Sequence, residues 1–134
     1  MTPQALATQL VDRYGLTAAD LVIEIGSGEG EFLRAVRQLG PRVLGIETDA
    51  VRVSRAFAAG IDTVRAVFNP ATAARVCRRY GVARVLIAGS PATAEPEFLA
   101  AAARCLTADG VVLLVGAAAL AECQPVEPTL PRAA

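Results

Sequence analysis

A glycine-rich turn between an apolar segment and a helical pattern is the segment of this sequence that is most informative about function. It runs from Glu24 through Gly26, Ser27 and Gly28 to Gly30, and the apolar run Leu-Val-Ile precedes it. Glycine lets the backbone turn tightly and lets a ligand approach without a Cβ in the way, while the following helix presents free amide groups. The segment therefore predicts a nucleotide-binding junction.

The glycine spacing and one acid distinguish between candidate ligands. Gly26, Gly28 and Gly30 form Gly-x-Gly-x-Gly, whereas a dinucleotide-binding fingerprint is Gly-x-Gly-x-x-Gly. Glu24 would repel a pyrophosphate, but it can attract or hydrogen-bond the cationic amino group of a methionine moiety. Both features favour S-adenosylmethionine (SAM) over NAD. An NAD-dependent oxidoreductase remains the least favoured alternative.

A second acid, Glu47, ends the apolar segment that begins at Arg42, about 20 positions after Gly26. At the carboxyl end of a strand, its carboxylate can accept hydrogen bonds from both hydroxyls of a ribose. The alternative is a solvated charge at a strand end or an acid beside a helix N-terminus. The pairing with the glycine loop favours the ribose-binding role.

Composition limits the classes of partner. The 134 residues are enough for one domain with a core, and 13 basic against 13 acidic residues leave no net charge. Nucleic acid and an anionic membrane surface are therefore not expected as partners. All the basic residues are arginine and histidine is absent, which removes the side chain most often used for proton transfer near neutral pH.

The cysteines and the apolar runs indicate no metal site, disulfide framework or membrane span. Cys77, Cys105 and Cys123 are widely spaced and form no Cys-x-x-Cys pair. No apolar stretch reaches the roughly 18 residues that a membrane span needs, and the first residues do not resemble a signal peptide. We therefore expect a soluble, cytoplasmic protein.

Short β-branched runs alternate with helical patterns, which predicts an α/β fold with a parallel sheet buried between helices. A first helix is expected over 3–14, capped by Thr2 and ended by Gly15. A later helix is expected over about 93–106. The expected strands are 21–25, 42–47, 62–68, 83–88 and 110–116.

The sequence Glu-Ile-Gly-Ser-Gly-Glu-Gly, followed by Gly-Ile-Glu at 45–47, resembles the first two cofactor motifs of class I SAM-dependent methyltransferases. The segments 60–64, 68–74 and 80–81 are similar to the sugar C-methyltransferases that act on nucleotide-linked deoxysugars. The resemblance covers roughly 16–115. It implies an open parallel sheet in the order 3-2-1-4-5.

The resemblance also implies roles for particular residues. Glu24, Gly26, Ser27, Gly28 and Gly30 would surround the methionine part of SAM. Glu47 would bind its ribose, and Phe68, at the end of the expected third strand, would lie near the adenine.

The chain departs from these C-methyltransferases after the fourth strand, where their asparagines and histidine are replaced by the segment 88–98. Glu95 and Glu97 are the acids to consider as a base there, although acids at a helix start also interact favourably with the helix dipole, and we favour that role. Tyr80 could be an acid or base, but its apolar helix face favours core packing.

The remaining expectations concern the carboxyl-terminal part. The family's zinc-binding region, its further domain and the final antiparallel hairpin of the sheet are not found in the sequence. We expect a domain over 1–121 and a proline-rich, extended or disordered tail over 122–134, with 117–121 as a short helix or a loop. An unpaired fifth strand would need cover from a second copy, another protein or 117–121.

Two functions follow. The favoured one is SAM-dependent methyl transfer to a small-molecule acceptor, in which the acceptor and the catalytic residues remain undefined. The alternative is a non-catalytic, methyltransferase-like protein that binds SAM or a protein partner.

Overall fold

The computed structural model describes residues 2–89, 96–115 and 125–126 of the chain. Its strands form one six-stranded sheet in the order β3-β2-β1-β4-β5-β6. The elements in chain order are α1 (Pro3–Tyr14), β1 (Leu21–Ile25), α2 (Glu31–Gln38), β2 (Arg42–Glu47), α3 (Ala50–Ala58), β3 (Thr63–Arg65), α4 (Pro70–Tyr80), β4 (Ala83–Gly89), α5 (Pro96–Cys105), β5 (Leu106–Val115) and β6 (Pro125–Val126).

The first helix begins and ends as predicted. The side chain of Thr2 accepts a hydrogen bond from the backbone N–H of Ala5 at 3.1 Å, and Pro3 occupies the first helical position. Gly15 ends the helix in the left-handed region at φ 58°. The Thr2 side chain and the Gly15 amide are hydrogen-bond partners for backbone groups that a helix end otherwise leaves unpaired. Residues close in the sequence therefore determine where α1 begins and ends.

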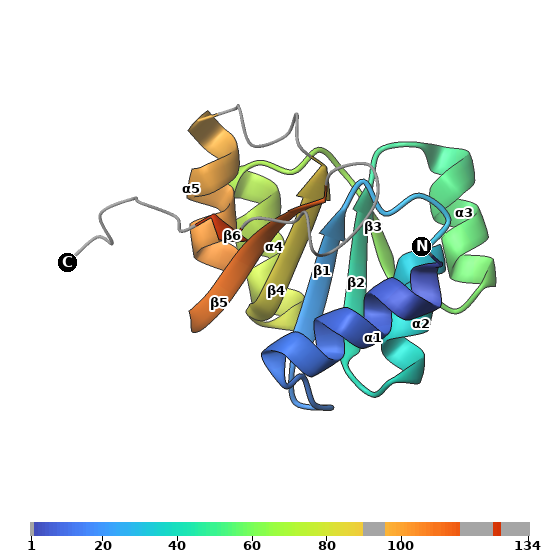
Figure 1. The fold of residues 1–134 in the computed structure, drawn as a ribbon. Helices are drawn as coiled ribbons and strands as arrows, with labels where there is room; N and C mark the ends of the chain where they lie inside the picture. Colours follow the sequence, from blue (N-terminus) through green and yellow to red (C-terminus); the bar gives the residue numbers. More distant parts are fainter. Residues whose placement is uncertain (1, 90–95, 116–124, 127–134) are drawn as a thin grey trace.

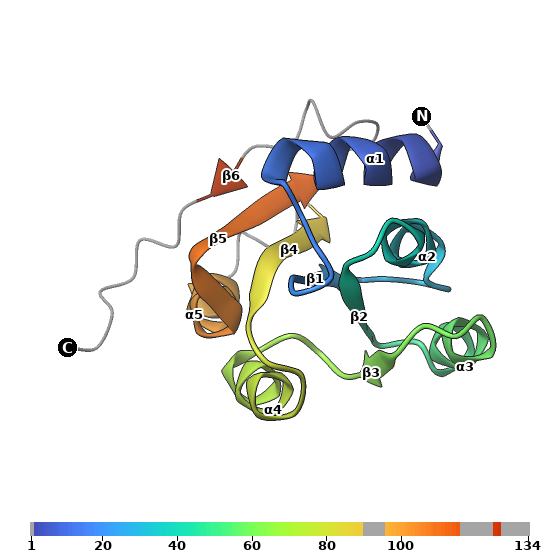
Figure 2. The ribbon, with the colours of Figure 1, turned by 90° about the horizontal axis from the view of Figure 1, so that it is seen from below.

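Helices cover both faces of the sheet (Figures 1 and 2). On one face, α1, α2 and α3 bury side chains such as Leu10 and Leu33 against Val22 of β1. On the other face, α4 and α5 bury Val76 and other apolar side chains against strands that include Ile23. Because both faces are buried, the central strands contain apolar runs such as Leu-Val-Ile at 21–23, as the sequence predicted.

The parallel register brings the carboxyl ends of β1, β2 and β3 together. Ile25 at the end of β1 pairs with Ile46 of β2, and Ile46 pairs with Val64 of β3. The chain runs outward from β1 to β3 and then crosses to β4 on the other side of β1. Ligands of open α/β sheets bind outside the carboxyl ends of the strands at such a switch point.

The predicted order 3-2-1-4-5 is confirmed, but several strand bounds are corrected. β3 has only three residues, Thr63–Arg65, so Phe68 lies in the loop after it and not at its end. β4 extends to Gly89, while β5 begins at Leu106, earlier than predicted, with a register irregularity opposite β4.

The sheet also continues beyond its fifth strand. β6 pairs antiparallel with β5, with Val112 opposite Val126 and Leu113 opposite Pro125. The expectation of a fifth strand without a neighbour is therefore wrong at these two positions, and two residues of the predicted tail belong to the sheet. The predictions for 93–95, 117–121 and Cys123 lie outside the described residues.

Candidate functional site

The glycine loop after β1 has the backbone geometry for which glycine is required. Gly26, Gly28 and Gly30 all have positive φ, at 75°, 61° and 84°. Backbone N–H of Gly26 donates to the carbonyl of Ile46 at 2.7 Å, which fixes the start of the loop on β2. A Cβ added at Gly26 or Gly28 would meet nothing within 4 Å, whereas one at Gly30 would lie 3.1 Å from Ile61. The first two glycines therefore border open space, and the third permits close packing.

Gly45 in β2 supports this loop, a role that was not predicted from the sequence. An ideal Cβ on Gly45 would overlap the Oγ of Ser27 and lie 2.9 Å from its Cβ. Ser27 is buried, and its Oγ has no hydrogen-bond partner among the described residues. A glycine inside a strand often marks such a close approach. The glycine at position 45 was therefore the sequence signal from which this contact could have been predicted.

Glu47 connects the second strand to the glycine loop. One carboxylate oxygen accepts a hydrogen bond from backbone N–H of Gly28 at 2.9 Å, and the other accepts from backbone N–H of Asp49 at 2.9 Å. Burial raises the pKa of this carboxyl group, but the backbone amides of Asp49 and Gly28 and the charge of Arg52 outweigh burial and lower the pKa overall. Glu47 is therefore held as a carboxylate with further lone pairs for a ligand.

Glu24 is in the opposite situation. Its Oε1 is buried and has no hydrogen-bond partner among the described residues. Burial, and secondarily the negative charge of Glu47, raise the pKa of Glu24 to about 8. A buried carboxyl oxygen without a hydrogen-bond partner is costly unless a ligand supplies one, so Glu24 suits a donor such as a cationic amino group.

A cavity of about 450 Å³ opens at the carboxyl edge of the sheet. The ends of β1 and β2, the loop after β3 and the first turn of α5 line it. The lining residues are Ile25, Gly26, Ile46, Glu47, Thr48, Ala66, Val67, Phe68, Asn69, Glu97 and Phe98. Carboxylate, backbone and aromatic groups thus meet in one volume.

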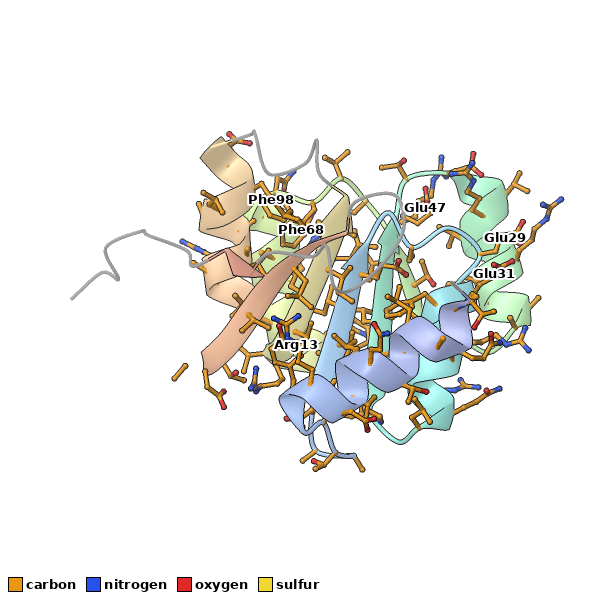
Figure 3. The ribbon with its side chains drawn as sticks, viewed as in Figure 1. Arg13, Glu29, Glu31, Glu47, Phe68 and Phe98 are labelled. Carbon is orange, nitrogen blue, oxygen red and sulfur yellow. The ribbon has the colours of Figure 1, made fainter. Side chains whose placement is uncertain are left out.

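Phe68 and Phe98 form one wall of this cavity (Figure 3). Their ring centroids are 5.5 Å apart, with an interplanar angle of 62°. Phe98 is buried, and Phe68 is half-buried against the same core. Phe98 was not identified from the sequence, because only the fold brings α5 beside the loop after β3.

Four of the seven predicted site residues meet at or beside this cavity. Gly26, Glu47 and Phe68 line the cavity, and Gly28 is bound to Glu47. Glu97 also lines the cavity from the first turn of α5, so its position fits a helix-dipole interaction and contact with a ligand.

Two other residues considered from the sequence, Tyr80 and Cys105, pack in the hydrophobic core. Tyr80 is half-buried and packs against the apolar core of α4 and α5, and Cys105 is buried there. Glu95 lies outside the described residues.

Across the described ranges, no three acidic, cysteine or histidine side chains gather in a way that could hold a metal ion. None of the helices described is long and apolar enough to span a membrane.

One curated protein of known class is similar in sequence. The C-methyltransferase NovU of Streptomyces niveus is 38% identical over 76 residues, which are 57% of this chain. The same residues are 18% of NovU, so the chain spans less than a fifth of that relative's length. No family model matches the chain. The similarity confirms the resemblance to C-methyltransferases on which the motif assignment rests.

Solved structures share the fold. Streptomyces venezuelae DesVI aligns with a TM-score of 0.64 at 15% identity, covering 84% of this chain and 50% of that one. A SAM-dependent methyltransferase from Geobacter sulfurreducens in complex with S-adenosyl-L-homocysteine aligns with a TM-score of 0.59 at 20% identity, covering 84% and 49%. The described residues share the α/β fold of these two structures.

Proposed function

We propose that this chain forms the cofactor-binding core of a methyltransferase that transfers a methyl group from SAM to a small-molecule acceptor. The observation that carries the proposal is the hydrogen bond from the Gly28 amide to the Glu47 carboxylate, 2.9 Å long. It joins the two predicted cofactor motifs at the carboxyl edge of the sheet, beside a cavity of suitable size. The fold and the similarity to a C-methyltransferase support the same conclusion.

The residues present fit the three parts of SAM. Open space over Gly26 and Gly28 leaves room for the methionine part, and the unpartnered Oε1 of Glu24 suits its amino group. Glu47, whose carboxylate keeps free lone pairs, would accept hydrogen bonds from the ribose hydroxyls. The apolar wall of Phe68 and Phe98 suits the adenine.

SAM would supply a methyl group on a positively charged sulfur, which a nucleophile of the acceptor can attack. The chain's own contribution is then to hold the donor rigidly and to align the acceptor with it. Glu97 is the described acid on the α5 side of the cavity, so it is placed to orient an acceptor hydroxyl or amine or to accept a proton.

Titration calorimetry tests the proposal without knowledge of the acceptor. We expect SAM and S-adenosylhomocysteine to bind in the micromolar range and NAD not to compete. Glu47→Ala removes a charged hydrogen-bond acceptor, and it should weaken SAM binding about tenfold or more. Glu31→Ala is the matched control, because Glu31 is an exposed acid in the first turn of α2 and does not line the cavity.

The outcomes separate the candidate functions. Unchanged SAM affinity in Glu47→Ala would remove the ribose assignment. Competition by NAD would favour an oxidoreductase. Binding of SAM without methyl transfer in a screen of small-molecule acceptors would support the non-catalytic, methyltransferase-like alternative.

A further inference from the structure

A second cavity, of about 440 Å³, lies between α4 and β3. Its lining residues are Val64, Thr72, Arg75, Val76, Arg78, Arg79 and Tyr80, and none of them lines the cofactor cavity. β3 is the outermost strand on this side of the sheet (Figures 1 and 2). The cavity is therefore separate from the glycine loop and needs its own explanation.

The rim of this second cavity is cationic. Arg75, Arg78 and Arg79 are exposed and follow one another at helical spacings of three and four residues, so they share one face of α4. α4 contains no acidic residue. The ion pairs found in the described part of the chain are Arg55 with Glu29 and Arg84 with Asp109, so these three arginines pair with no described acid.

The three positive charges are not explained by helix stability alone. Arg78 and Arg79 lie in the last turn of α4, where cations favourably meet the helix dipole. Arg75 lies before that turn and gains less from the dipole, while like charges at these spacings repel each other. An anion bound between the guanidinium groups would relieve this repulsion.

The floor of the cavity is apolar and aromatic. Val76 is buried, Val64 and Tyr80 are half-buried, and the guanidinium of Arg79 lies 5.5 Å from the centre of the Tyr80 ring. Arg42 donates to the backbone carbonyl of Tyr80 at 3.2 Å and so holds the end of α4 against β2. An apolar floor below a cationic rim suits a ligand with an organic body and an anionic head.

We propose that this second cavity binds a small organic phosphate. The planar fork of a guanidinium group matches phosphate oxygens in a two-point hydrogen bond, and several arginines together match a doubly charged phosphate better than a single carboxylate. The organic part of the ligand would rest on Val64, Val76 and the Tyr80 ring. The cavity is within the usual size of small-molecule sites.

Phenyl phosphate is the probe for this site, with inorganic phosphate and phenol as its charged and uncharged halves. Nuclear magnetic resonance of backbone amides should show shifts over 72–80 on addition of phenyl phosphate, with the glycine loop unchanged. We expect phenyl phosphate to bind about tenfold more tightly than inorganic phosphate, and phenol not to bind.

Arginine variants test the cationic rim. Loss of one charged hydrogen-bond partner in Arg75→Ala or Arg79→Ala should weaken phenyl phosphate binding about tenfold, and the double variant more. Arg34→Ala, which removes an exposed arginine of α2 outside both cavities, is the control and should bind as the wild type does. Equal affinity in the double variant and the wild type, shifts confined to the glycine loop, or no binding at millimolar phenyl phosphate would each overturn the proposal.

Discussion

Two glutamates at neighbouring strand ends have opposite electrostatic environments. Glu47 accepts two backbone hydrogen bonds, and its pKa is lowered, whereas the Oε1 of Glu24 has no described partner and its pKa is raised to about 8. One acid is therefore ionised throughout the neutral range, and the other is mainly protonated until a ligand binds. This difference makes both stability and ligand affinity depend on pH.

The free energy of unfolding should depend on whether Glu24 is protonated. The folded chain binds this proton more tightly than the unfolded chain, with a pKa of about 8 against 4.5. The contribution of Glu24 to the free energy of unfolding is therefore fully present below about pH 4.5, decreases as pH rises and is lost above about pH 8. Glu24→Gln should remove this decrease, so its stability relative to the wild type should rise by roughly 3–4 kcal/mol between pH 5 and pH 8. Urea denaturation at both pH values measures the difference, and parallel curves for the two proteins would contradict the expectation.

The affinity for SAM should also depend on the protonation of Glu24, but it should increase as pH rises. If the Glu24 carboxylate binds the amino group of SAM, binding below about pH 8 must release the carboxyl proton to solvent. The affinity should then rise about tenfold per pH unit as pH increases toward 8. Calorimetry at pH 6.5 in two buffers with different ionisation enthalpies counts the released protons. We expect close to one for the wild type and close to none for Glu24→Gln, and equal counts would contradict this role of Glu24.

Among the elements of the fold, β2 packs against the glycine loop and limits the position of Ser27. Gly45 must lack a side chain because Ser27 occupies the space above it. Gly45→Ala should therefore displace Ser27, destabilise the fold by about 1–3 kcal/mol and weaken SAM binding. Thermal unfolding and SAM titration measure both effects.

A second substitution distinguishes this contact from a general strand effect. Ser27→Ala removes the Oγ that the new Cβ would overlap, so Ser27→Ala combined with Gly45→Ala should recover part of the lost stability. Simple additivity of the two changes would show that the Ser27 hydroxyl is not the group that excludes a side chain at Gly45.

The sequence predicted those parts of the site that depend on local signals. Positive φ at Gly26 and Gly28 follows from residue type, and the place of Glu47 follows from the end of an apolar strand. The contact of Gly45 with Ser27 and the Phe98 wall could not be predicted, because they depend on strand register and on the packing of α5. β6 has only two residues, too few for a periodic pattern.

At the scale of the whole molecule, β6 covers part of the outer edge of β5. Unpaired strand edges promote association between chains. A variant without residues 125–134 should therefore self-associate more than the full chain at the same concentration. Size-exclusion chromatography with light scattering measures the mass, and an unchanged monomer in both proteins would show that β6 does not protect the edge.

The arrangement of the sheet places every proposed cofactor contact at one edge. The glycine loop, Glu47 and the Phe68 and Phe98 wall lie at the carboxyl ends of the strands (Figure 3), whereas the arginine-lined cavity lies beside α4. A ligand at the cofactor site should thus leave the second half of α4 unaffected. This separation allows the two proposed sites to be tested independently on one protein.

A SAM titration of the wild-type chain, followed through its backbone amide resonances, measures whether the glycine loop binds the cofactor. The amide of Gly28 reports on the site, because it donates to Glu47 and borders the open space over the loop. We predict saturable shifts at Gly26, Ser27, Gly28 and Phe68 with micromolar affinity, and none over 75–80. No shifts at millimolar SAM, or shifts that avoid the glycine loop, would contradict the assignment of this edge of the sheet as the cofactor site.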